Sequence, residues 1–225
     1  MEKQFSTFTL QDIDPQAASL LKRLQPDGSS EGQSEELAFF SEVVTIFSRE
    51  AELPIEQLSA FPATVILRYL TNSHRYYLGK RVPEIEQLLS QLSAQNLNVP
   101  AHLVSFFSWM RQNMEKHFRI EEQSLFPYIE ALESLSKGEN AADIRSKFKE
   151  FSIQRFTDTH SDEIEDQLSE VKKQIIRSFV SLEALFPYRV LIQKLDLFEK
   201  DLRLHARVED EVLVPKALEW EKLLR

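Results

Sequence analysis

The chain has 225 residues, no cysteine and a formal net charge of -9 at pH 7. The absence of cysteine excludes disulfides, thiolate-held zinc or iron-sulfur sites and a thiol nucleophile, so any metal ion must be held by histidine and carboxylate. The negative charge, with no basic cluster, argues against a nucleic-acid partner, because a phosphate backbone requires a basic face. With 42% hydrophobic residues but only four Gly and nine Pro, the composition predicts a mostly helical, globular protein.

The N-terminal part predicts a small helical extension. Asp14 followed by Pro15 is a helix start, and an apolar stripe follows it at Ala18, Leu20 and Leu21. The stretch PDGSSEGQS, residues 26–34, is typical of a linker. We therefore divide the chain into residues 1–34, extension and linker, and residues 35–225, the main body. The start of the chain has no secretory pattern, and no long apolar run occurs, so we expect a cytoplasmic protein without a membrane partner.

The main body predicts helices separated by short breaks. Residues 35–60 carry two short helical patterns, and the segments QNLNVP (95–100), SKGEN (136–140) and LFPY (185–188) are the expected turns after them. They leave four long runs, the first interrupted near Gly79 and Pro83, at 61–95, 101–135, 141–184 and 189–223. Long helices with short connections predict an all-α, up-and-down four-helix bundle with its core at 61–225. A helical repeat array is the alternative, but the sequence lacks its period.

Four of the five histidines fall one on each predicted long helix. They are separated by 43, 43 and 45 residues along the chain, and they are His74, His117, His160 and His205. In an up-and-down bundle, equal separations across alternate ends place side chains at equal depth, so the four imidazoles are expected to meet near mid-height. His102 is left over and is interpreted as an ordinary surface residue at a helix start.

A repeated motif adds two carboxylates to this layer. HFRIEEQSLFP, residues 117–127, and HARVEDEVLVP, residues 205–215, share a His, a Glu four residues later, and a Leu and a Pro. Glu121 and Glu209 therefore lie beside their own histidines on one helix face. Imidazole with carboxylate suits iron, manganese or zinc, and six such groups favour two ions. The alternative is that each histidine is a hydrogen-bonded core residue; the equal spacing favours the metal.

Residues around this layer have more ordinary interpretations. Four aromatic residues are expected to be packing residues, two of them, Tyr77 and Tyr128, able to donate hydrogen bonds near the site; the others are Tyr76 and Trp109. The remaining acids near the histidines are expected on a solvated face or just outside the ligands, and they are Glu122, Asp162, Glu163, Asp210 and Glu211.

These stretches resemble the hemerythrin-like (HHE) domain over about residues 61–225, and within it the iron-sulfur cluster repair family, also called repair of iron centres. The resemblance rests on NSHRYYLGKRVPEIEQLL, HFRIEEQSLFPYIEAL, DTHSDEIEDQL and LHARVEDEVLVP. It implies a non-haem, oxo-bridged centre of two iron ions, in which the ligands are His74, His117, Glu121, His160, His205 and Glu209. In that arrangement the two glutamates bridge the ions.

The resemblance also implies a function. Members of this family support the repair of iron-sulfur clusters damaged by nitrosative or oxidative stress, by iron release or by nitric oxide reduction. The implied partners are iron, nitric oxide or dioxygen, and damaged iron-sulfur proteins. The alternative is a hemerythrin-like binder or sensor of these molecules without turnover. The chain lacks the cysteine pair of many family members, and it shows no fifth histidine ligand of the oxygen carriers. A ferritin-like oxidase is disfavoured, because no histidine has a Glu three residues before it.

Overall fold

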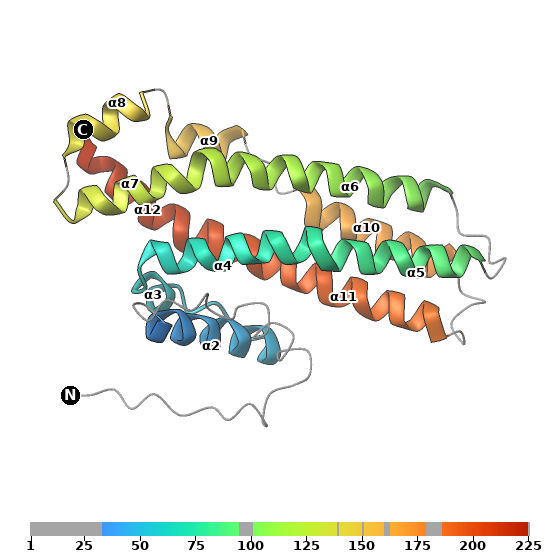
Figure 1. The fold of residues 1–225 in the computed structure, drawn as a ribbon. Coiled ribbons are helices and arrows are strands. Elements are labelled where there is room, and N and C mark those ends of the chain that lie inside the picture. Colours follow the sequence, from blue (N-terminus) through green and yellow to red (C-terminus); the bar gives the residue numbers. More distant parts are fainter. Residues whose placement is uncertain are drawn as a thin grey trace.

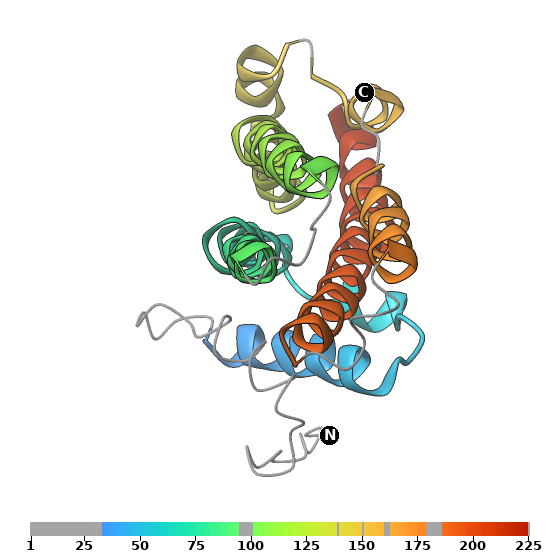
Figure 2. The ribbon, with the colours of Figure 1, turned by 90° about the vertical axis from the view of Figure 1, so that its right-hand side faces the viewer.

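The computed structural model describes residues 33–94, 101–138, 140–149, 151–159, 163–178 and 186–224. Within these ranges the regular elements are all helical, and none is a strand. The long helices form rods that lie side by side (Figure 1), and the view along them shows the rods grouped around a common interior (Figure 2). The predicted all-α four-helix bundle is therefore confirmed.

Three of the four rods consist of two α-helices joined by a π-helical turn. The first rod contains α4 (Ala63–Tyr76), η2 (Tyr77–Arg81) and α5 (Val82–Ala94). The second rod contains α6 (Ala101–Ile120), η3 (Glu121–Leu125) and α7 (Phe126–Ser136). The fourth rod contains α11 (Phe186–Arg207), η5 (Val208–Leu213), α12 (Val214–Glu221) and a final 3-10 turn, η6 (Lys222–Leu224).

Each π turn is followed by a proline at the second residue after its end, and these are Pro83, Pro127 and Pro215. In an ordinary α-helix, proline removes a donor and its ring collides with the carbonyl four residues earlier. A π turn is wider and bonds over five residues, so it accommodates the proline without breaking the rod. The predicted interruption of the first helix near Gly79 and Pro83 corresponds to η2, where the α-helix changes to a π turn, although the rod continues through it.

The third rod corrects a prediction. The single helix expected over 141–184 is divided into α8 (Ala141–Lys147), α9 (Ile153–Thr159) and α10 (Glu163–Ser178). Between α8 and α9, the rings of Phe148 and Phe151 pack on Tyr128 of α7, with centroids 5.1 and 5.0 Å away. These contacts hold the chain against α7, so tertiary packing overrides the local helical pattern.

The predicted turn at residues 185–188 extends too far toward the C-terminus. Helix α11 begins at Phe186, so Pro187 is its second residue. A proline in the first turn of a helix loses no hydrogen bond, because the amides there have no partner within the helix. The sequence LFPY therefore contains the start of α11, and the prediction of a turn is wrong from Phe186 onward.

Two apolar clusters fill the bundle, and they meet where the histidines lie. On the first rod, Leu70 belongs to one cluster and Tyr77 to the other, with His74 between them. On the second rod the clusters change between Phe118 and Leu125. The same change occurs on the fourth rod near His205. The polar layer predicted at mid-height therefore separates two hydrophobic cores.

Two further helices cover the bundle from outside the four rods. They are α2 (Gln33–Arg49) and α3 (Ile55–Ser59), and both appear below the rods in Figure 1. The buried side of α2 includes Phe39, Phe40 and Val43, which join the same apolar cluster as Leu70. This shared core supports treating α2 as part of the main body. The extension predicted for residues 1–34 lies almost wholly outside the described residues, and the domain division remains a prediction.

No helix among the described residues combines the length and apolar character that crossing a membrane requires.

Candidate metal centre

The structure brings three of the predicted histidines to one level of the bundle. His74 is near the end of α4, His117 near the end of α6 and His205 near the end of α11. Each lies just before a π turn, and two of these turns carry the predicted carboxylates, Glu121 as the first residue of η3 and Glu209 as the second residue of η5. The fourth predicted histidine, His160, lies outside the described residues.

His102 lies at the opposite end of α6 from His117. The two residues are 15 positions apart, which corresponds to about 22 Å at the α-helical rise of about 1.5 Å per residue. Its side chain is not among the described ones. Its position on the helix agrees with the interpretation of His102 as a residue away from the site.

The Glu121 carboxylate lies between two imidazoles. Its Oε1 is 2.8 Å from His117 Nε2, and its Oε2 is 3.2 Å from His74 Nε2. His74 Nε2 is also 3.2 Å from His205 Nε2. The side chains of Glu121 and His74 are 0% and 2% exposed, whereas that of His117 is 19% exposed. Glu121 therefore joins His74 and His117, and His74 in turn meets His205, in a layer that is buried except at His117.

These distances and donor types fit a metal site in part. Nitrogen and oxygen ligands lie about 2.0–2.2 Å from a first-row metal, so neighbouring ligands of one ion are about 3 Å apart. The pairs that His74 makes with Glu121 and His205 have this spacing. However, among the described residues, no group of three or more His, Asp or Glu side chains is arranged so that it could hold an ion as it stands. Small rotations that open the contacts around Glu121 are needed.

The His74 imidazole is held by contacts at Nδ1 and on its ring face. Its Nδ1 lies 2.8 Å from Glu122 Oε1, at the edge of the bundle. Its ring stacks on Phe118, with centroids 3.8 Å apart and planes 7° apart. A carboxylate at Nδ1 holds the proton there and directs the lone pair of Nε2 to the interior, as metal-binding histidines require. Glu122 thus has the expected place just outside the ligands.

Sequence reasoning missed a buried polar pair beside this layer. The Tyr77 hydroxyl donates to Asp201 Oδ1 at 3.0 Å and to the Asp201 carbonyl oxygen at 3.2 Å. Asp201 is 2% exposed and lies four residues before His205 on α11. Asp201 lies one helical turn before the predicted ligand His205, on the same buried face of α11. This spacing is the signal in the sequence that could have identified Asp201. The other tyrosine predicted near the site, Tyr128, instead donates to Glu221 at 2.9 Å.

A small crevice connects the layer with the surface. It is bounded by side chains of α6, α10, α11 and η5, namely His117, Phe118, Ile164, Leu202, His205, Ala206, Glu209 and Asp210. Glu209 is 6% exposed and therefore lines the inner part of this opening. Glu209, the second predicted carboxylate, thus lines the same crevice as His117 and His205.

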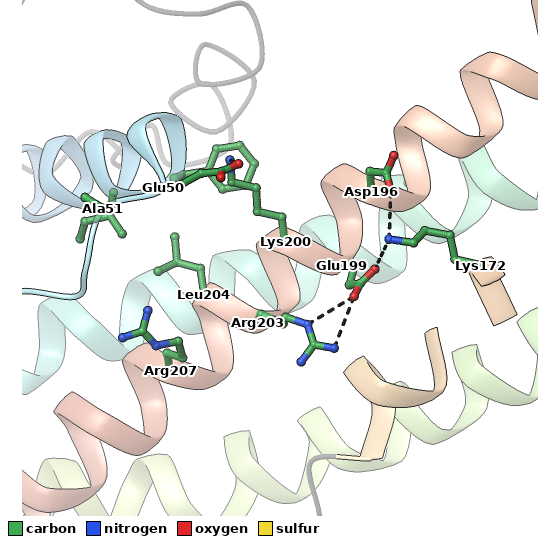
Figure 3. A pocket seen from close by; sticks show the side chains of 11 residues that line it. Glu50, Ala51, Lys172, Asp196, Glu199, Lys200, Arg203, Leu204 and Arg207 are labelled. Carbon is green, nitrogen blue, oxygen red and sulfur yellow. Dashed lines mark hydrogen bonds and ion pairs between the residues drawn. The ribbon is translucent and has the colours of Figure 1, made fainter. Parts of the chain in front are cut away.

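A larger groove lies away from the histidine layer. It has a volume of about 540 Å³ between the end of α2, α10 and α11 (Figure 3). Its charged side chains pair with one another: Lys172 Nζ lies 2.9 Å from Asp196 and 2.5 Å from Glu199, and Lys200 lies 2.9 Å from Glu50. Because these lysines already have carboxylate partners, the groove offers weaker binding chemistry than the histidine layer.

Buried imidazoles and a carboxylate at one level of four long helices define a class of helical cation-binding bundles. The comparison with known families assigns the chain within this class. The sequence model of the hemerythrin HHE cation-binding domain matches residues 65–217, so the chain belongs to the hemerythrin HHE family. No curated protein matches the chain. The family match supports metal binding by this bundle.

Proposed function

We propose that the chain is a non-haem di-iron protein whose ligands are His74, His117, Glu121, His160, His205 and Glu209. The observation that carries the proposal is the position of Glu121. Its two oxygens approach different imidazoles, His74 and His117, in a layer with almost no exposure to solvent. A carboxylate in this position suits a bridge between two ions, one beside each imidazole.

In this proposal the protein side chains hold and orient the ions. Glu122 keeps the proton of His74 on Nδ1, so that Nε2 faces inward. The stacked Phe118 ring restricts rotation of the same imidazole. Four imidazoles and two carboxylates would provide six donor groups for two ions, so positions for a small ligand would remain. When bound, iron supplies an electrophilic centre for a small ligand at these positions and a source of single electrons.

We further propose that the protein supports the repair of iron-sulfur clusters after nitrosative or oxidative stress. The exposure of His117 supports this role, because its side chain is 19% exposed at the crevice and the proposed site therefore lies close to solvent. Reduction of two nitric oxide molecules to nitrous oxide and water takes two electrons and two protons, so this route requires an external electron donor. Iron release requires no such donor.

A hemerythrin-like binder or sensor of dioxygen, nitric oxide or iron is the second candidate. The same closeness to solvent favours it, since reversible binding of a small molecule also requires access from solvent. The two candidates share the metal site and differ in whether a damaged cluster is restored.

The metal assignment is tested by metal analysis and the absorption spectrum of freshly purified protein from iron-supplemented cells. We expect close to two irons per chain and the near-ultraviolet absorption of an oxo-bridged diferric pair. One zinc per chain, or no metal, would contradict the di-iron assignment.

The repair assignment is tested by the recovery of a nitric-oxide-damaged, aconitase-type hydratase in an extract. Wild-type protein and His102→Ala are expected to restore activity, whereas Glu121→Gln and Glu209→Gln are not. Equal recovery with wild type, both Gln variants and buffer alone would remove the repair role and leave the binder.

A further inference from the structure

Tyr77 is a fully buried phenol held beside the histidine layer. It is the first residue of η2, three residues after His74, and its hydroxyl donates to the carboxylate of Asp201 at 3.0 Å. Asp201 is itself buried at 2% exposure. A phenol loses an electron much more readily when a base takes its proton at the same time. Tyr77 and Asp201 provide both groups within one hydrogen bond.

The Tyr77 ring also connects the site with the surface. On its inner side it meets the His205 imidazole edge-on, with centroids 5.7 Å apart. On its outer side it meets Tyr76, with centroids 6.3 Å apart. Tyr76 is half-buried, and the cations of Lys80 and Arg81 lie 5.6 and 5.2 Å from the centre of its ring. Both ring separations lie within the usual range of aromatic contacts.

We propose that Tyr77 and Tyr76 form a one-electron relay that carries oxidising equivalents from the histidine layer to the surface, with Asp201 as the proton acceptor of Tyr77. The relay rests on the proposed metal site, where a peroxide is the oxidant. Its benefit is chemical protection: an oxidising equivalent that leaves through two phenols does not attack the imidazole of His205 or the neighbouring side chains.

The step balances as follows for each phenol. Tyr77 loses one electron to the oxidant, its O–H bond breaks, and the proton forms an O–H bond with Asp201 Oδ1. Tyr76 then gives one electron to the Tyr77 radical, Asp201 returns its proton to Tyr77, and Tyr76 releases its own proton to solvent. A peroxide that becomes two waters takes two electrons and two protons. It therefore oxidises two phenols, or one phenol and one ferrous ion with a proton from solvent.

Two other tyrosines provide matched comparisons. Tyr69 also lies beside His205, with centroids 6.3 Å apart, but its ring continues to Phe39 of α2, which is hard to oxidise. Tyr128 is buried and donates to a carboxylate, Glu221, as Tyr77 does to Asp201, but its ring packs on Phe148 and Phe151. Among the described residues, Tyr69 thus has the ring contact with His205 but no onward contact with a phenol, and Tyr128 has the carboxylate but no ring contact with a histidine.

The test is electron paramagnetic resonance of iron-loaded protein, frozen shortly after hydrogen peroxide is added. Wild type is expected to give a tyrosyl radical, and Tyr77→Phe to lose at least nine-tenths of it at unchanged iron content. Asp201→Asn, which keeps the size but removes the proton acceptor, is expected to lower the yield several-fold. Tyr69→Phe and Tyr128→Phe are expected to match wild type, and Tyr76→Phe to prolong the radical on Tyr77.

Peptide mass spectrometry after the same treatment provides a second readout. Oxidation is expected at Tyr76 in wild type and at His205 or its neighbours in Tyr77→Phe. A full radical yield in Tyr77→Phe with normal iron content, or loss of the radical in Tyr69→Phe, would overturn the relay and leave the metal site intact. A wild-type protein that binds no iron would overturn the relay together with the proposed function, and the metal analysis identifies that case.

Discussion

The two copies of the repeated motif lie at the same level of the bundle, yet their side chains are buried differently. In the first copy the carboxylate is the inner residue, since the side chain of Glu121 is 0% exposed while that of His117 is 19% exposed. In the second copy both residues are buried, His205 at 4% and Glu209 at 6% exposure, and His205 meets His74 at 3.2 Å. Identical spacing in the sequence therefore gives different local environments.

The difference arises from the neighbours of each copy. Glu121 is the first residue of its π turn, whereas Glu209 is the second residue of its turn, so the two carboxylates leave their helices at different points. The second copy also faces Ile164 of α10 across the crevice. A helical motif therefore specifies which groups share a face, and the surrounding rods decide which of them is deepest.

The largest expected effect is the loss of metal, since both copies serve one site in our proposal. A ligand present at a thousand times its Kd stabilises the folded state by about 4 kcal/mol. For a chain of this size that corresponds to about 8–16 °C in Tm. Calorimetry of iron-loaded and chelator-treated protein measures it, and His160→Ala should melt like the metal-free protein. Equal Tm values for the iron-loaded and the chelator-treated protein would contradict a metal site shared by the two copies.

The next effect distinguishes the two carboxylates. Because Glu121 contacts two imidazoles in a dry layer, Glu121→Gln should weaken iron binding about 100-fold, and Glu209→Gln, at the crevice, about tenfold. Competition with a coloured chelator measures both, with Glu211→Gln as the matched control of equal charge change on η5. A larger loss in Glu209→Gln than in Glu121→Gln would reverse the comparison.

A smaller effect concerns the acid that follows each glutamate. Glu122 orients His74 through a 2.8 Å contact, so Glu122→Gln should weaken iron binding about tenfold. Asp210 lines the crevice, and Asp210→Asn should weaken binding about threefold or less by the same reasoning. The same chelator competition distinguishes them, and equal losses would show that the outer acids act only through charge.

The smallest effect concerns the helices that lead into each copy. Before the second copy, Lys172 joins α10 to Glu199 of α11 at 2.5 Å. Although burial alone raises the pKa of Glu199, the hydrogen bond and charge of Lys172 lower it from the ordinary 4.5. A lowered carboxyl pKa stabilises the fold above 4.5, and this stabilisation disappears as the pH falls through the lowered value.

Lys172→Met should therefore lower the free energy of unfolding by about 1 kcal/mol near neutral pH, with the difference shrinking in acid. Before the first copy, Arg111 pairs with Glu86 at 3.3 Å on a more exposed face. Arg111→Met should cost about 0.5 kcal/mol or less. Urea unfolding of both variants at several pH values measures these effects, and a difference for Lys172→Met that persists in strong acid would contradict the ion-pair origin.

The sequence predicted the parts of the fold that depend on local pattern. The helix predicted over 101–135 matches the second rod almost from end to end, and the four-residue spacing placed Glu121 beside His117. The turn predicted at 95–100 lies outside the described residues. The π turns were missed, although Pro83, Pro127 and Pro215 mark them. From the sequence alone, a single proline is equally compatible with a helix kink and with a π turn, so it does not identify which of the two occurs.

The remaining misses depend on contacts between distant segments. The third helix breaks because Phe148 and Phe151 pack on Tyr128, which no periodicity within 141–184 reveals. The Tyr77–Asp201 hydrogen bond joins residues 124 positions apart. The roles of His160 and of all six ligands together remain predictions, since His160 lies outside the described residues.

The polar layer between the two hydrophobic cores has a consequence for folding cooperativity. Each core holds its own ends of the rods, and the side chains between them are imidazoles and carboxylates, which join the halves weakly unless they bind a common partner. Without such a partner, the halves can open as separate units with different free energies, which amide hydrogen exchange resolves. An ion bound by residues of several rods couples the halves, so that amides on both sides exchange through one common opening.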